Sequence, residues 1–300
     1  MPVFTVQHTT TYRYRQPVGF GEHHLMLRPV ESRDQRLLAA DLTITPEPTS
    51  LHWWEDELGN RVGTARFSGR AKLLCFQSTI RVDQTPWVPS NPQAADGLLQ
   101  PPPGHTAESG LQLFLKRRHG DPDGTVAAWA RSFLASDPNG GFSALGTMTR
   151  AIHDGFTYVR REEPGIQEPA QTLVGRAGSC RDFSVLMIEA ARALGIPARF
   201  VSGYLHVPSR GGENYHGGGS THAWVQAYLP ETGWTDFDPT NGILGNRDLI
   251  RVAATPEPRQ VVPLSGTFIG FPADQIGMQV SVCVSAEEDR ERDERRGLVV

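Results

Sequence analysis

Cys180 is the residue in this 300-residue chain whose surroundings best suit nucleophilic chemistry. It follows a short Ala-Gly-Ser segment and opens a stretch, 180–194, whose apolar residues recur at helical spacing. The unpaired N–H groups and the dipole at a helix N-terminus favour a thiolate, and they can also receive a developing oxyanion. The sequence therefore predicts a reactive thiol, with a cysteine that merely packs at a helix start as the alternative.

A thiol nucleophile needs a base, and the base needs a group that orients it. His222 lies in an alternating segment, 221–229, and Asp238 ends the next strand-like segment, 233–238. The short connection between the two segments predicts an antiparallel pair that brings the carboxylate to the imidazole. Pro239 favours an extended backbone at Asp238. The alternative for His222 is an ordinary strand histidine without chemistry.

Three nearby residues are weaker candidates. Asp236 competes with Asp238, since both side chains point the same way on a regular strand. Asp182 is expected to cap the first turn of the helix rather than to take part in chemistry. Trp224 is a candidate for lining the substrate cleft, with packing as the alternative.

Histidines 206, 216 and 222 carry no metal-binding motif, so no metal is expected. No phosphate-binding loop of the Walker or dinucleotide type is present, and no cofactor is expected. The glycine-rich segment 209–220 leads directly to His222. It is expected either to shape access to the site as a mobile loop or to serve as a plain connection.

Four regions are expected to organise the chain. They are a β-rich N-terminal domain (1–85), a proline-rich linker (86–110), a catalytic core (111–285) and a charged tail (286–300). In the first region, Gly59-Asn60 between two aromatic-rich arms predicts a hairpin. In the core, the helix at 180–194 is followed by predicted strands at 198–207, 221–229 and 233–238. Cys75 and Cys283 lie in apolar, strand-like runs and are expected to be small buried residues.

The composition excludes several classes of protein. Lys and Arg number 29 and Asp and Glu 33, a net charge of −4, so nucleic acid is not an expected partner. Three scattered cysteines suit a reducing compartment, and no segment is apolar enough for a membrane span. A cytoplasmic protein without membrane association is expected, and its oligomeric state stays open.

Several motifs across residues 170–242 resemble the transglutaminase-like superfamily of papain-fold cysteine enzymes, in its bacterial branch described as cysteine proteases. The motifs are G-x-C-x-D at the helix start, L-G-I-P-A-R leading into a strand, H-A-W, and W-x-x-F-D-P-T-N-G. In the N-terminal region, Arg28-Pro29 and Leu58-Gly59-Asn60 resemble the β domain that precedes the core in that branch.

The resemblance implies an α+β fold, in which a papain/transglutaminase-like core follows a β-rich N-terminal domain. In that core, a helix bearing Cys180 packs on an antiparallel sheet bearing His222 and Asp238. The resemblance also implies that Cys180 is the nucleophile, that His222 is the general base and acid, and that Asp238 orients the imidazole. Cys180 N–H and, by analogy with relatives, Tyr158 are the expected oxyanion donors.

The implied reaction is hydrolysis or acyl transfer at amide or isopeptide bonds of peptides or proteins, through a thioester. The alternative is a non-catalytic module that binds peptides in the same groove.

Overall fold

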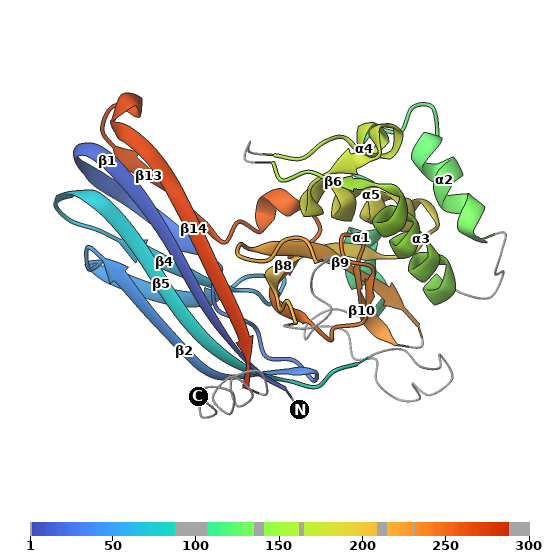
Figure 1. Cartoon of the computed structure of the whole chain (residues 1–300), viewed down its shortest axis with the longest axis horizontal. Helices are drawn as coiled ribbons and strands as arrows, with labels where there is room; N and C mark the ends of the chain where they lie inside the picture. Colours follow the sequence, from blue (N-terminus) through green and yellow to red (C-terminus); the bar gives the residue numbers. More distant parts are fainter. Residues whose placement is uncertain are drawn as a thin grey trace, which may run out of the picture.

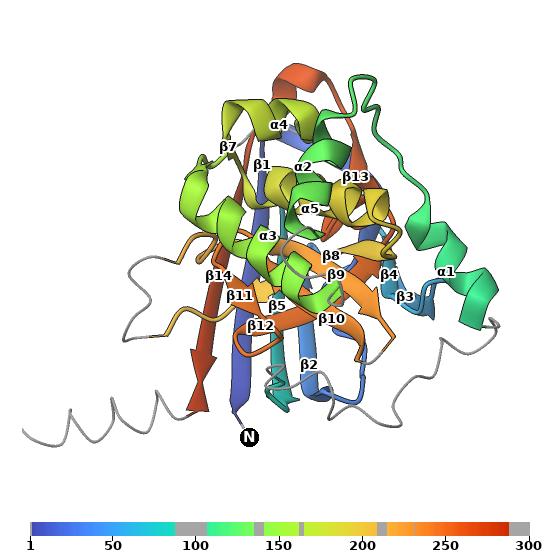
Figure 2. The ribbon, with the colours of Figure 1, turned by 90° about the vertical axis from the view of Figure 1, so that its right-hand side faces the viewer.

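A computed structural model describes residues 2–87, 107–134, 141–161, 165–208, 215–230 and 232–287 of the chain. The linker and tail expected from the sequence fall mostly outside these residues. The described part forms three layers (Figures 1 and 2), with the helices between residues 125 and 193 on one face of a five-stranded sheet and a larger sheet on its other face. None of the helices in the described ranges is long and apolar enough to cross a membrane.

The larger sheet is built around one long strand, β1. Its N-terminal strands run in the order β2-β5-β1-β4-β3, and β13 and β14 also pair with β1. The strands are β1 (Val3–Leu25), β2 (Gln35–Thr45), β3 (Ser50–Glu55), β4 (Arg61–Arg66), β5 (Arg70–Gln84), β13 (Leu264–Ile269) and β14 (Gln275–Ala286). The predicted β-rich N-terminal region is confirmed. The predicted hairpin is formed by β3 and β4, and Gly59 adopts a positive φ of 83° in its turn.

The C-terminal strands β13 and β14 were predicted within the core region 111–285, but they belong to the larger sheet. β14 pairs with β1 from Phe4↔Ala286 to Tyr14↔Gln275, so residues 264–286 extend the N-terminal sheet. The alternating sequence predicts a strand here but cannot indicate its partner, because partner choice depends on contacts distant in sequence. The expected burial of the two strand cysteines is also wrong. Cys283 is exposed and Cys75 is half-buried, because both occupy outward positions of the ladder.

The core holds the five-stranded sheet and the helices. The sheet order is β11-β10-β9-β8-β12, and a short parallel pair, β6-β7, precedes α5. The strands are β6 (Thr157–Tyr158), β7 (Ala177–Gly178), β8 (Ala198–Leu205), β9 (His222–Leu229), β10 (Gly233–Asp238), β11 (Ile243–Leu244) and β12 (Leu249–Thr255). The helices are α1 (Ala107–Leu115), α2 (Thr125–Leu134), α3 (Gly141–Gly155), α4 (Pro169–Gly175) and α5 (Cys180–Ala193), with 3-10 turns at Pro258–Gln260 and Pro272–Asp274.

Two apolar clusters hold the layers together. On one face, α5 residues such as Phe183 and Leu186 pack with Val225 of β9 and Phe237 of β10. On the opposite face, Tyr204 of β8 and Ile250 of β12 pack with apolar residues of β1, β5 and β14. The α+β fold expected from the sequence is confirmed: a helix starting at Cys180 packs against an antiparallel sheet that carries His222 and Asp238.

The hairpin turn of the larger sheet is tied to the core by a buried asparagine. The side chain of Asn60 donates to the carbonyl of Ala254 at 3.1 Å and accepts from its N–H at 2.8 Å. Asn60→Ala removes both hydrogen bonds, so the carbonyl and the N–H of Ala254 in β12 lose their side-chain partner. We expect the free energy of unfolding to fall by about 2–4 kcal/mol, as measured by urea denaturation. The exposed Gln77→Ala serves as control and should change it little; equal effects of the two variants would contradict this account.

Candidate active site

The start of α5 is fixed by a buried carboxylate two residues after Cys180. Asp182 accepts hydrogen bonds from the N–H and hydroxyl of Ser179, the N-cap residue, both at 2.8 Å. The same carboxylate accepts from Gln167 N–H at 2.7 Å and from Arg161 at 3.0 Å. Asp182 therefore caps the helix, as the sequence analysis expected, and joins the segment before α4 to the turn that carries Cys180.

β9 and β10 bring His222 and Asp238 together. The two strands pair antiparallel from Gly233↔Leu229 to Phe237↔Val225, as predicted. His222 opens β9 and Asp238 ends β10, so both lie at the same end of the pair. His222 Nε2 lies 2.8 Å from Asp238 Oδ2, and both side chains are fully buried. A buried pair of this kind holds the imidazole in one orientation.

Asp238 is held in turn by the residues that follow it. Its Oδ1 accepts from Thr240 N–H at 2.9 Å, and its Oδ2 accepts from Asn241 Nδ2 at 2.7 Å. Asn241 Nδ2 also lies 3.4 Å from His222 Nε2. The residues after Asp238 in the Asp-Pro-Thr-Asn motif thus donate hydrogen bonds to its carboxylate and fix its orientation toward the imidazole.

Asp236, the alternative to Asp238, contacts the indole ring of Trp224. It accepts a hydrogen bond from the indole N–H of Trp224 at 2.6 Å. Trp224 is fully buried, and its ring is stacked near His222 with 6.0 Å between centroids. The expectation that Trp224 lines the cleft is therefore wrong: its side chain packs with Val201 and Leu205 of β8 next to the imidazole and is absent from the described cleft lining.

Cys180 and His222 face a common cleft of about 510 Å³. Its core side is formed by the start of α5, the start of β9, and β6. The facing wall comes from residues 258–263 and from β14, through Val261, Pro263, Met278 and Val280. The C-terminal strand that joins the N-terminal sheet thus forms part of the cleft around the thiol.

Comparisons with known proteins agree with this architecture. Residues 127–239 match the sequence profile described as the transglutaminase-like superfamily, and residues 4–83 match the bacterial transglutaminase-like N-terminal region. An uncharacterised protein of Mycobacterium tuberculosis is 30% identical over 88% of this chain and 86% of its own length. The chain belongs to the bacterial transglutaminase-like family.

Two further similarities place this transglutaminase-like chain among known proteins. A protein-glutamine gamma-glutamyltransferase of Pseudomonas aeruginosa is 31% identical over 43% of this chain, but that match covers 20% of the relative. A crystal structure from Cytophaga hutchinsonii, whose assignment as a cysteine protease is provisional, superposes with a TM-score of 0.69. It is 19% identical and covers 94% of this chain and 90% of its own, so it shows the shared fold.

The transglutaminase-like site strongly favours a charged imidazole. Burial alone would lower the pKa of His222, but the Asp238 carboxylate and the Cys180 side chain outweigh it and raise this pKa to about 10. Burial likewise would raise the pKa of Asp238, but the imidazole and the hydrogen bonds from Asn241 and Thr240 lower it. An imidazolium held beside a thiol is suited to pair with a thiolate.

The second ring nitrogen of His222 is enclosed by a glycine. Nδ1 is buried, and because Nε2 is directed at Asp238, Nδ1 is the ring nitrogen that is left to interact with the Cys180 side chain. A Cβ at Gly217, whose φ is 96°, would lie 2.5 Å from that nitrogen. Only glycine permits both this backbone conformation and this close approach. Residues 215–220 of the glycine-rich segment therefore lie against the site, while 209–214 fall outside the described residues and the expected loop mobility stays a prediction.

Tyr158 lies in the same cleft as Cys180, at the end of β6. Its ring stacks on His216 with 4.8 Å between centroids and 7° between planes. Burial and then the nearby Cys180 raise the pKa of Tyr158 to about 12, against the opposing effect of two arginines. The phenol therefore keeps its proton and is able to donate a hydrogen bond within the cleft.

The charged pair makes stability depend on pH in a defined window. The pKa of His222 rises from 6.5 to about 10 on folding, so its stabilisation is complete below pH 6.5 and is lost as the pH approaches 10. We expect the difference in melting temperature between wild type and His222→Gln to be largest near pH 6 and to shrink by pH 10. Thermal unfolding of both proteins across this range measures it. A constant difference would show that His222 does not titrate as described.

Sequence reasoning missed two residues of the site. Asn241 stands in the motif that carries Asp238, three residues after it, and its amide could have been predicted to donate back to the carboxylate, next to the Asx-type turn that Asp238 forms with Thr240 N–H. Gly217 is one of several neighbouring glycines, and nothing in the sequence distinguishes it. Of the residues that the sequence singled out, Cys180, His222 and Tyr158 line the cleft, Asp238 lies directly behind His222, and Trp224 lies away from the cleft.

Proposed function

We propose that this protein is a cysteine-dependent enzyme that cleaves or transfers acyl groups at amide bonds of peptides or proteins. The observation that carries the proposal is the buried His222–Asp238 pair, 2.8 Å apart, which opens onto the same cleft as a cysteine at a helix start. In the roles proposed here, Cys180 is the nucleophile, His222 the general base and acid, and Asp238 the residue that orients and charges the imidazole.

The reaction begins with attack of the Cys180 sulfur on the amide carbonyl. The carbon–sulfur bond forms as the carbonyl oxygen becomes an oxyanion; the proposed donors to it are Cys180 N–H at the helix start and the Tyr158 hydroxyl, which lines the same cleft. The His222 imidazolium then gives its proton to the leaving amine, and the carbon–nitrogen bond breaks to leave a thioester. His222 next takes a proton from the acceptor, whose oxygen or nitrogen attacks the thioester; the carbon–sulfur bond breaks and Cys180 is released as a thiolate beside the imidazolium.

Either water or a primary amine completes this sequence. The cleft of about 510 Å³ has room for a second molecule beside the thiol, and the partial similarity to a gamma-glutamyltransferase favours a glutamine carboxamide as acyl donor. When no amine is bound, water is the acceptor and the thioester is hydrolysed. None of the described lining residues selects an amine over water, so hydrolysis is the expected default. The peptide or protein substrate and the cytoplasmic location stay predictions.

Trapping the acyl-enzyme tests the proposal. The protein is incubated with a library of glutamine-containing and other peptides, and mass spectrometry locates the mass added to the chain. We expect a thioester adduct on the peptide that contains Cys180, and none in Cys180→Ala. Adding a fluorescent primary amine then reveals whether acyl transfer competes with hydrolysis. Peptides that bind in the cleft without forming an adduct would favour a non-catalytic peptide-binding module instead.

A further inference from the structure

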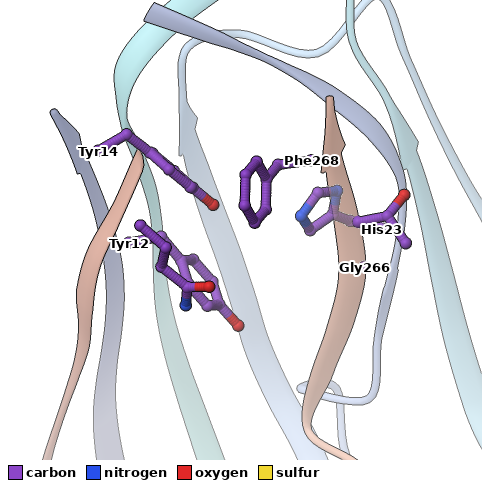
Figure 3. Close-up of a pocket in the computed structure, with 7 residues that line it drawn as sticks. Tyr12, Tyr14, His23, Gly266 and Phe268 are labelled. Carbon is purple, nitrogen blue, oxygen red and sulfur yellow. The ribbon is translucent and has the colours of Figure 1, made fainter. Parts of the chain in front are cut away.

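A second cavity lies in the larger sheet, away from the thiol. It has a volume of about 330 Å³ and is bordered by β1, β13 and β14. We call it the aromatic pocket, and its principal lining residues are Tyr12, Tyr14, His23, Thr267, Phe268 and Gln275. Figure 3 shows the two tyrosines on one wall, His23 on the facing wall and the ring of Phe268 between them.

The rings of the aromatic pocket are fixed by packing. Tyr14 packs at 5.1 Å from Phe268 and at 5.8 Å from Phe20, measured between ring centroids. His23 is enclosed by Phe20, Phe67 and Phe76, with centroids 5.5–6.3 Å away. A ligand would therefore meet ring surfaces that are already in place, which lowers the entropic cost of binding.

Several polar side-chain atoms of the aromatic pocket form no hydrogen bond within the described part of the chain. Within the described residues, neither the Tyr12 nor the Tyr14 hydroxyl takes part in a hydrogen bond. His23 uses one ring nitrogen, Nδ1, to contact the carbonyl of Gly21 at 2.9 Å, which leaves Nε2 for another partner. The amide of Gln275 and the hydroxyl of Thr267 add further neutral donors and acceptors. No charged side chain is found among the described residues of the lining.

We propose that the aromatic pocket binds a neutral saccharide unit. A sugar ring combines apolar C–H faces, which suit the tyrosine and phenylalanine rings, with a rim of hydroxyl groups, which suits the neutral polar atoms around them. An aromatic side chain of a peptide would fill the same volume but has at most one polar group. It would leave most of the hydroxyl, imidazole and amide groups desolvated without partners, which disfavours binding.

The aromatic pocket lies beside the active-site cleft on the same face of the sheet. Tyr12 of β1 is paired with Met278 of β14, and residues paired in an antiparallel ladder project to the same face as close neighbours. Tyr12 lines the aromatic pocket and Met278 lines the active-site cleft. If the proposed function holds, a substrate that carries a sugar near its reacting amide could occupy both cavities.

Saccharide binding is tested without any turnover. Maltotriose, cellotriose and the trimer of N-acetylglucosamine are titrated into the full chain, and binding is followed by saturation-transfer difference NMR. N-acetyl-tyrosine amide is titrated in the same way, to test whether the pocket binds an aromatic side chain of a peptide instead. At least one trisaccharide is expected to bind with a millimolar or lower Kd. The Tyr12→Phe/Tyr14→Phe double variant is expected to weaken binding about tenfold, because it keeps the rings and removes the two hydroxyls.

Tyr228→Phe, on β9 of the other sheet, is the matched control and should leave binding unchanged. The proposal is overturned if none of the three trisaccharides binds at millimolar concentrations, if only the tyrosine amide binds, or if the double variant binds as wild type does. Circular dichroism of the double variant guards against a folding defect. Cys180→Ala is expected to bind the saccharide normally, so failure here is distinguishable from failure of the proposed amide chemistry.

Discussion

Replacing Cys180 by alanine is expected to lower the rate of amide cleavage by at least about 10⁴-fold, because no other thiol lies among the described residues that line the cleft. The side chain is nearly buried and small, and alanine fills most of its volume, so the fold should be retained. The measurement is release of amine from a peptide found to acylate the protein, with circular dichroism of the variant alongside.

The other two cysteines provide matched controls for this substitution. Cys75 and Cys283 lie on the larger sheet, outside the lining of the cleft. Cys75→Ala and Cys283→Ala are expected to retain activity within a few-fold of wild type. A Cys180→Ala protein that keeps a substantial share of the activity, or a Cys283→Ala protein that loses it, would disprove the assignment of the nucleophile.

Asp238→Asn is expected to lower kcat by roughly 10²–10⁴-fold with little change in KM. The carboxylate accepts from His222 at 2.8 Å and is the group that most favours the charged imidazole. A neutral amide cannot stabilise the imidazolium, and its NH₂ group competes with Asn241 and the imidazole for the same space. The variant should also lower the pKa of His222, which NMR titration of the ring measures.

Asp236→Asn is the matched control, since it makes the same chemical change two residues away on the same strand. Asparagine at this position retains an oxygen able to accept from the indole of Trp224, so kcat should stay within a few-fold of wild type and the pKa of His222 should change little. If Asp236→Asn lost more activity than Asp238→Asn, the two aspartates would have to exchange their proposed roles.

The sequence predicted those parts of the site that depend on local pattern. Cys180 opens a helix because Ser179 and Asp182 cap it, and both residues can be identified in the sequence as capping types. The pairing of His222 with Asp238 followed from two alternating segments and a short connection. In each case the determining residues lie within about twenty positions of one another, where hydrophobic period and turn length constrain the geometry.

Features that depend on contacts distant in sequence were not predictable in this way. Trp224 and His222 have the same orientation on β9 and both are buried, but only the packing around the start of β9 places His222 in the lining of the cleft and Trp224 outside it. β14 joins β1 across more than 250 residues of chain, so its contribution to the cleft cannot be inferred from its own alternation. The role of Gly217 arises from a close approach to His222 that only the folded backbone defines.

The central claim is that Cys180 reacts as a thiolate paired with the His222 imidazolium. The most direct test is the rate of iodoacetamide labelling of each cysteine between pH 5 and 9, followed by mass spectrometry in wild type and His222→Ala. Cys283 is free, exposed and outside the described lining of the cleft, which makes it the internal comparison. We expect Cys180 to label rapidly below pH 7 in wild type and to lose that advantage in His222→Ala. Labelling of Cys180 that is as slow as that of Cys283 below pH 7, or that is unaffected by His222→Ala, would contradict the claim.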